Sequence, residues 1–157
     1  MTNNKAFLFS TLDRLASADI RAWLFGGWAE ELWGIISPRP HRDVDLLLPA
    51  REFTQVERLL AASSDVTELV LKRFSHKRAF LLENILVELI LVTEDAGHYQ
   101  TNFFSGGFHF DWPPDTFCMT VPCGDREVPV ASPAALRAYR KQHDKIDACY
   151  ESYVREK

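Results

Sequence analysis

The chain has 157 residues, of which 46% are hydrophobic and 25% are charged. This length fits one ordinary domain, and the mixture is typical of a globular protein with its own core. The formal net charge of −4 argues against a nucleic-acid partner held by a broadly basic surface. We find no signal peptide and no apolar run near the roughly 20 residues of a membrane span, and the three cysteines suggest no disulfide framework. We therefore expect a cytoplasmic protein without a membrane partner.

The first part of the chain is predicted to alternate helices with short buried strands. Apolar residues recur at helical spacing in three segments and form short apolar runs in two others. The predicted helices cover residues 5–18, 28–33 and 51–62, and the predicted strands cover residues 22–25 and 44–48. Pro38 and Pro40 cannot continue the second helix, because each proline holds the residue before it in extended geometry.

The second part is predicted to be mostly extended, with one long helix at its end. Five strands are expected, over residues 66–74, 78–82, 85–92, 117–121 and 127–130, and the aromatic stretch 101–116 is expected to be irregular. Glu83 and Asn84 suit a two-residue hairpin turn. Ser132 and Pro133 begin a helix that reaches about residue 154, because a capping hydroxyl precedes a proline at the first helical position.

This order of elements predicts an α/β (α+β) fold in which helices flank a mixed sheet. We find no linker and no internal repeat. The prediction is one domain over residues 1–157, with a small C-terminal helical part from about residue 132.

A glycine pair, Gly26-Gly27, stands between the first predicted strand and the second predicted helix. Backbone N–H groups at such a position can contact phosphates closely, although most such pairs are only tight turns. Arg39, His41 and Arg42 follow and could bind the β- and γ-phosphates or a leaving pyrophosphate; the alternative for each is a solvated loop.

Asp43 and Asp45 open the next predicted strand, sixteen residues after Gly27. Alternate residues of a strand face the same side, about 6.5–7 Å apart. Strand interiors disfavour aspartate, and carboxylate oxygens suit Mg²⁺. The alternative is structural, with Asp43 capping a turn and Asp45 pairing with Arg39 or Arg42.

Glu88 is the third candidate carboxylate, isolated within the apolar run 85–92. Burying an ionised carboxylate costs several kcal/mol unless a charge compensates it. A metal ion shared with Asp43 and Asp45 would do so, and so would an ion pair with Lys72, Arg73 or Arg78.

Together these residues suggest nucleotidyl transfer, in which a hydroxyl attacks the α-phosphorus of a nucleoside triphosphate. One or two Mg²⁺ ions, or Mn²⁺, would screen the phosphates and hold the attacking and leaving oxygens in line. Asp43 and Asp45 are predicted metal ligands, and Glu88 either completes the metal site or removes the hydroxyl proton.

The segments 25–29 and 39–46 resemble antibiotic nucleotidyltransferases of the DNA polymerase β superfamily. The likeness is greatest to the aminoglycoside 2″-nucleotidyltransferase and lincosamide nucleotidyltransferase group, which has a Gly-Gly-Trp-Ala type segment followed by Arg-x-His-x-Asp-ϕ-Asp, where ϕ is apolar. It implies a polymerase-β-like fold, with Asp43 and Asp45 as metal ligands and Gly26-Gly27 as the triphosphate-binding turn. Glu88 matches the third acidic position, which is usually Asp in the aminoglycoside enzymes.

The resemblance implies ATP or another nucleoside triphosphate as co-substrate and a small-molecule hydroxyl as acceptor, with antibiotic resistance as a consequence. Two alternatives remain open: modification of a protein or RNA, as in toxin–antitoxin nucleotidyltransferases, and a non-catalytic nucleotide-binding module. A homo-oligomer also stays open. Surplus acidic residues expected near the cleft favour a cationic acceptor slightly: Glu30, Glu31, Glu94 and Asp95. His143, Asp144 and Asp147 form either a solvated face of the last helix or a further acceptor contact.

Overall fold

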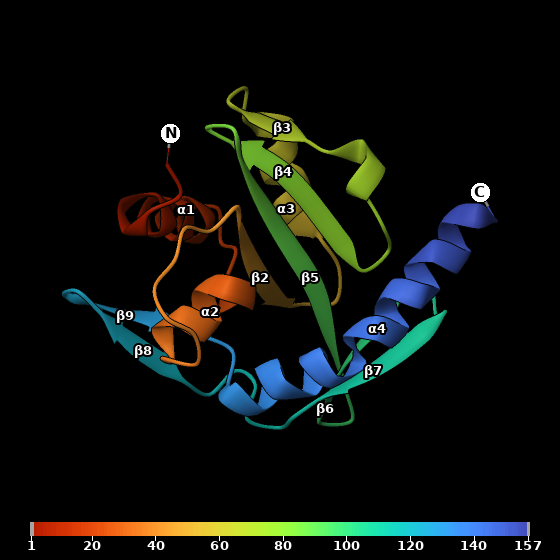
Figure 1. Ribbon diagram of the computed structural model, residues 1–157. Coiled ribbons are helices and arrows are strands. Elements are labelled where there is room, and N and C mark those ends of the chain that lie inside the picture. The colour runs from red at the N-terminus through yellow and green to blue at the C-terminus, as the bar shows by residue number, and fades with distance from the viewer. Residues whose placement is uncertain (1, 157) are drawn as a thin grey trace.

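A computed structural model describes residues 2–156, and a seven-stranded mixed sheet is its central feature (Figure 1). The helices are α1 (Lys5–Ser17), α2 (Gly26–Leu32), α3 (Thr54–Ala62) and α4 (Pro133–Arg155), with a 3₁₀ turn η1 (Val70–Lys72). The strands of the large sheet are β1 (Trp23–Phe25), β2 (Asp43–Pro49), β3 (Val66–Glu68), β4 (Lys77–Leu82), β5 (Ile85–Asp95), β6 (His98–Phe103) and β7 (Phe108–Trp112). A separate two-stranded sheet contains β8 (Thr120–Cys123) and β9 (Arg126–Pro129).

The large sheet has the order β1-β2-β5-β4-β3, and β6 and β7 extend it from the far end of β5. The central pair, β2 and β5, is parallel, and the other pairs are antiparallel. These two strands carry the fully buried side chains of Leu46, Leu47 and Leu89. A run so apolar is expected of a strand that is covered on both faces. The mixed sheet with flanking helices confirms the predicted fold class.

The helix cap and the hairpin turn predicted from the sequence are both present in the structure. Ser132 caps α4 by accepting a hydrogen bond from the Ala135 N–H at 3.1 Å. Glu83 and Asn84 join β4 to β5 with positive φ angles of 52° and 66°, the geometry of a tight hairpin turn. These features depend on residues within one turn of each other, which is why the sequence alone predicts them.

Two predicted segments are wrong. Residues 66–74 form β3, then η1, because β3 leaves its antiparallel pairing with β4 after Glu68 and the chain turns into a 3₁₀ helix at Val70. Residues 101–116 are not irregular, because β6 and β7 form a hairpin whose turn contains Gly106 and Gly107. Burial of aromatic side chains from this hairpin explains its order: Phe103, Phe110 and Trp112 are each less than 5% exposed.

The segment before α4 is tied to β1 and to the end of α2. Val130 forms an isolated parallel bridge with Leu24 of β1, and the Trp33 indole N–H donates to the Ala131 carbonyl at 2.9 Å. α4 then passes in front of the sheet and alongside β7 (Figure 1). α4 therefore faces the sheet across a cavity that residues of both elements line. Within residues 2–156, no helix combines the length and the apolarity needed to cross a membrane.

Candidate active site

The parallel register of β2 and β5 brings the three candidate carboxylates together. Asp45 stands directly across from Glu88, and Asp43 lies two residues earlier on the same face of β2. All three line one cavity of about 670 Å³ between the sheet and α4. Adjacent strands lie about 4.8 Å apart, so these carboxylates form one acidic cluster.

Gly26 lies directly against Asp45. The antiparallel register of β1 and β2 pairs Phe25 with Asp45, and the chain then enters α2 at Gly26, with a φ of +66°. A Cβ atom on Gly26 would stand 2.4 Å from Oδ2 of Asp45. Only glycine meets both the backbone and the space requirement here. Because α2 begins at Gly26, the glycine pair forms the first turn of the helix and not a loop before it.

The environment of Asp45 disfavours its negative charge. Burial, followed by repulsion from Asp43 and Glu88, raises the pKa of Asp45 to about 7. Burial and then Glu88 also raise the pKa of Asp43. Among residues 2–156, no cation pairs with either aspartate, so the alternative of an ion pair between Asp45 and Arg39 or Arg42 is wrong.

Glu88 is compensated by two lysines. Oε1 is 2.9 Å from Nζ of Lys72 and Oε2 is 2.6 Å from Nζ of Lys77. Burial alone would raise the pKa of Glu88, but the lysines outweigh it and the net pKa is lowered. Arg73 and Arg78, which the sequence offered as partners, both pair with Glu57 instead. Glu88 thus faces the aspartates and is ion-paired as well.

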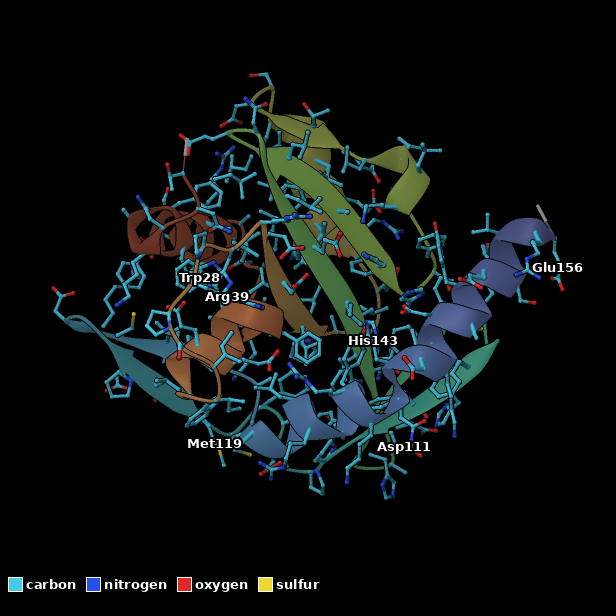
Figure 2. All side chains as sticks on the ribbon, in the orientation of Figure 1. Trp28, Arg39, Asp111, Met119, His143 and Glu156 are labelled. Carbon is cyan, nitrogen blue, oxygen red and sulfur yellow. The ribbon has the colours of Figure 1, made fainter. Side chains whose placement is uncertain are left out.

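The basic loop before β2 is anchored beside α2. His41 Nε2 lies 2.9 Å from Oε1 of Glu31, and the His41 ring packs on Trp28 at 4.4 Å between centroids. Figure 2 shows Trp28 and Arg39 close together beside α2. A Cβ on Gly27 would stand 2.9 Å from Nδ1 of His41, so Gly27 lets this loop approach the helix. Arg39, His41, Arg42 and Gly27 are not among the residues that line the cavity, and their phosphate contacts stay predictions.

One stripe of α4 forms the wall opposite the carboxylates. Its members recur at helical spacing: Leu136, Tyr139, Arg140, His143, Asp144 and Asp147. His143 is labelled in Figure 2, where α4 approaches the end of β5. Tyr139 is stacked parallel to Trp112, with ring centroids 6.0 Å apart, and meets Phe25 edge to face at 4.9 Å. The β6–β7 hairpin thereby holds a cavity-lining tyrosine in place.

Arg140 links α4 to α2. Its guanidinium forms an ion pair with Glu30, whose side chain is 13% exposed while that of Arg140 is 68% exposed. Of Glu30, Glu31, Glu94 and Asp95, the surplus acidic residues expected near the cleft, Glu30 alone lines the cavity. Glu31 binds His41, Glu94 lines a separate depression beside Pro49 and Gly97, and Asp95 is exposed.

Sequence reasoning missed Lys77, Tyr139 and Arg140. Lys77 could have been found from the predicted Glu83-Asn84 turn. A two-residue turn there pairs Ala79 with Glu88, and Lys77 lies on the same face of its strand as Ala79. Among residues 2–156, no three His, Cys, Asp or Glu side chains are grouped as a ready metal site. Metal binding at Asp43, Asp45 and Glu88 therefore stays a prediction.

A mixed sheet that presents a glycine turn and an acidic cluster to one cavity is the architecture of a nucleotidyltransferase. The chain belongs to the aminoglycoside-2″-adenylyltransferase family, whose sequence profile matches residues 7–151. It is a nucleotidyltransferase, and the predicted resemblance to antibiotic nucleotidyltransferases is confirmed. No curated protein sequence matches the chain significantly.

Solved structures of low identity share the fold. The lincomycin-bound lincosamide antibiotic adenylyltransferase LnuA has a TM-score of 0.72 at 19% identity, over 96% of this chain and 98% of that one. ANT(2″)-Ia in complex with adenylyl-2″-tobramycin has a TM-score of 0.61 at 13% identity, over 96% and 97% of the two chains. A candidate nucleotidyltransferase from Thermotoga maritima has a TM-score of 0.61 at 21% identity, over 100% and 97%.

Proposed function

We propose that this enzyme transfers AMP from ATP to a hydroxyl group of a small-molecule antibiotic. The observation that carries the proposal is the convergence of Asp43, Asp45 and Glu88 beside Gly26 in one cavity. Membership of the adenylyltransferase family favours ATP over other nucleotides and a small molecule over a protein or RNA acceptor.

A divalent ion fits Asp43 and Asp45. Both offer hard oxygen ligands, as Mg²⁺ and Mn²⁺ prefer. Neither forms an ion pair among the described residues, although Lys72 and Lys77 attract both carboxylates from a distance. The raised pKa of Asp45 means that a bound cation would relieve repulsion already present. When bound, the ion would neutralise charge on the transferring phosphoryl group.

The chain's own residues would divide the remaining work. The backbone around Gly26 and Gly27 would contact the triphosphate, with Arg39, His41 and Arg42 nearest to the outer phosphates or the pyrophosphate. Glu88 faces the same cavity as Asp45 and would complete the ion's site or accept the proton of the acceptor hydroxyl. The cavity wall formed by α4 would exclude water from the phosphoryl group.

The acceptor site is proposed to suit a molecule that carries amino groups. Glu30 of α2 and Asp144 and Asp147 of α4 line the same cavity as the acidic cluster, and carboxylates attract ammonium groups. A less charged acceptor is favoured by a different observation, the apolar surface of Phe25, Leu136 and Tyr139 in the same cavity. An aminoglycoside would use the first set and a lincosamide the second.

A pyrophosphate-release assay tests the proposal. The protein would be incubated with each nucleoside triphosphate, Mg²⁺ or Mn²⁺, and a panel of aminoglycosides, lincosamides and unrelated polyols. We expect release that depends on ATP, on the divalent ion and on one antibiotic class, with the antibiotic gaining the mass of an adenylyl group. Asp43→Asn should lower turnover by ~10² or more, because the ion stabilises the transition state by a few kcal/mol. Full turnover in this variant, or release without any acceptor dependence, would contradict the proposal.

A further inference from the structure

The environment of Glu88 differs from that of the two aspartates beside it. Both of its carboxylate oxygens already contact ammonium groups, Oε1 at 2.9 Å from Lys72 and Oε2 at 2.6 Å from Lys77. Asp43 and Asp45 face the same cavity with no such partner among residues 2–156. Within the acidic cluster, the negative charges without a direct ion pair are therefore those of the two aspartates.

Lys77 is built into the sheet at this position. It lies on β4 two residues before Ala79, which stands directly across from Glu88, so Lys77 and Glu88 share one face as diagonal neighbours. The Ala79 side chain is a single methyl group, so it is too short to block the Lys77 side chain from Glu88 on this face of the sheet. The Lys77 side chain is 20% exposed and lines the cavity itself.

Lys72 reaches Glu88 from a different element. It ends the 3₁₀ turn η1, and its side chain is 44% exposed. Because this lysine is more open to solvent, its pair with Glu88 is screened more strongly than that of Lys77. Lys77 is therefore the main internal cation of the cluster.

In sites that use two divalent ions, the second ion shares the charge of the carboxylates and the phosphates. We propose that the Lys77 ammonium takes this place at Glu88, so that the nucleotide-bound enzyme holds one divalent ion, on Asp43 and Asp45, and not two. The inference rests on the proposed function. It makes Lys77 a positioning residue, which holds the Glu88 carboxylate by the ion pair and withholds it from the metal.

Counting bound Mn²⁺ tests this inference without any turnover. The enzyme would be saturated with α,β-methylene-ATP, which cannot release pyrophosphate, and titrated with Mn²⁺ while free Mn²⁺ is followed by electron paramagnetic resonance. We expect one Mn²⁺ per nucleotide-bound wild-type chain. Lys77→Met, or Lys72→Met combined with Lys77→Met, frees Glu88 and should raise the count to two.

Three further variants sharpen the reading. Lys77→Arg keeps the positive charge and should keep a count of one. Lys141→Met removes an exposed lysine from α4, away from Glu88, and should also keep one. Adding Glu88→Gln to Lys77→Met should return the count from two to one. Melting curves of each variant without Mn²⁺ identify any that fail to fold. If the methionine variants do not fold, the count of the wild-type chain decides the test: one Mn²⁺ supports the inference and two refute it.

The inference is overturned by two Mn²⁺ in the wild-type chain, by fewer than one, or by no increase in either methionine variant. These outcomes are separate from failure of the proposed function. An enzyme that adenylylates an antibiotic and holds two Mn²⁺ would refute the role of Lys77 alone. A chain that never releases pyrophosphate in the acceptor screen would refute the function.

Discussion

At the scale of single residues, the site is defined by a charge that folding disfavours. The Asp45 side chain packs closely against the backbone of Gly26, and the carboxylates of Asp43 and Glu88 repel its negative charge. Structural reasons alone would not keep an aspartate here, because a neutral side chain of the same shape would fit with less repulsion. The unfavourable free energy of burying the charged Asp45 beside two carboxylates is consistent with a role in binding a cation.

The raised pKa of Asp45 predicts how stability depends on pH. Unfolded aspartate titrates near ~3.9, whereas folded Asp45 titrates at about 7, so the folded state binds more protons between these values. Without divalent ions, this residue therefore makes the free energy of unfolding fall as the pH rises from about 4 to about 7. Asp45→Asn should raise the melting temperature at pH 8 by a few degrees, at ~2–4 °C for each kcal/mol, and the gain should shrink at pH 5.

Calorimetry at pH 5 and pH 8 in EDTA measures this difference. Asp95→Asn, at an exposed position of β5, is the matched control and should change neither value. Mg²⁺ with nucleotide should stabilise the wild-type chain at pH 8 and stabilise Asp45→Asn much less, since the ligand is lost. An Asn variant that melts at the wild-type temperature at pH 8 would contradict the assigned environment of Asp45.

At the scale of elements, the β6–β7 hairpin is the support for the α4 wall. Trp112 is 4% exposed, and its indole N–H donates to the Thr101 hydroxyl at 2.8 Å. Its ring also packs against Phe110 at 4.6 Å between centroids, in addition to its stack on Tyr139. The hairpin is thus a packed layer whose inner face fixes one side of the cavity.

Trp112→Leu should therefore affect both stability and the acceptor site. We expect a loss of ~3 kcal/mol in the free energy of unfolding, because a large buried aromatic is truncated. The Thr101 hydroxyl also loses the hydrogen bond donated by the indole, although it keeps its own bond to the Leu91 carbonyl. Urea denaturation measures this loss. His109→Ala lies on the same strand with a side chain that is 48% exposed, and it should change stability by under ~0.5 kcal/mol.

The acceptor KM separates the two roles of Trp112. Because Tyr139 loses its stacking partner, the acceptor KM of Trp112→Leu should rise more than the ATP KM. Equal changes in both constants, or none, would show that the hairpin does not shape the acceptor side of the cavity.

At the scale of the whole molecule, the cavity is closed by parts from opposite ends of the chain. The sheet supplies the acidic cluster and α2 supplies Glu30, which pairs with Arg140 of α4. α4 crosses in front of the sheet (Figure 1). An ammonium group of an acceptor would compete with the exposed Arg140 guanidinium for the more buried Glu30 carboxylate. The two partners of this pair should therefore have opposite effects on a cationic acceptor.

Glu30→Gln should raise the KM of an aminoglycoside, and Arg140→Ala should lower it, each by roughly two- to five-fold, as expected for a pair with one exposed partner. Both effects should weaken as salt rises, because exposed charges are screened. Steady-state kinetics at low and high ionic strength measure them. Glu94→Gln is the control, since Glu94 lies at a different depression. Shifts of the same sign in both variants would refute competition for Glu30.

The sequence by itself determined the features that depend on neighbours along the chain. The Asp43-x-Asp45 spacing, the Ser132 cap and the Glu83-Asn84 turn are local, and the structure has the expected elements at each. The glycine pair follows the predicted strand as expected, but α2 begins at Gly26 and not after the pair. Glu88 can also be recognised from the sequence, because a charged side chain buried in an apolar strand is unfavourable unless another charge compensates it. The sequence therefore indicated the fold class and the three carboxylates.

Only the tertiary structure decided which partners these residues meet. Lys72, Arg73 and Arg78 are equivalent in sequence, yet Glu88 pairs with Lys72 of η1 and Lys77 of β4. Both arginines pair with Glu57. The α4 wall, its Arg140–Glu30 pair and the aromatic hairpin likewise join segments far apart in the chain. The physical reason is that residue spacing sets which side of an element a side chain faces, whereas strand register and helix docking set what it faces.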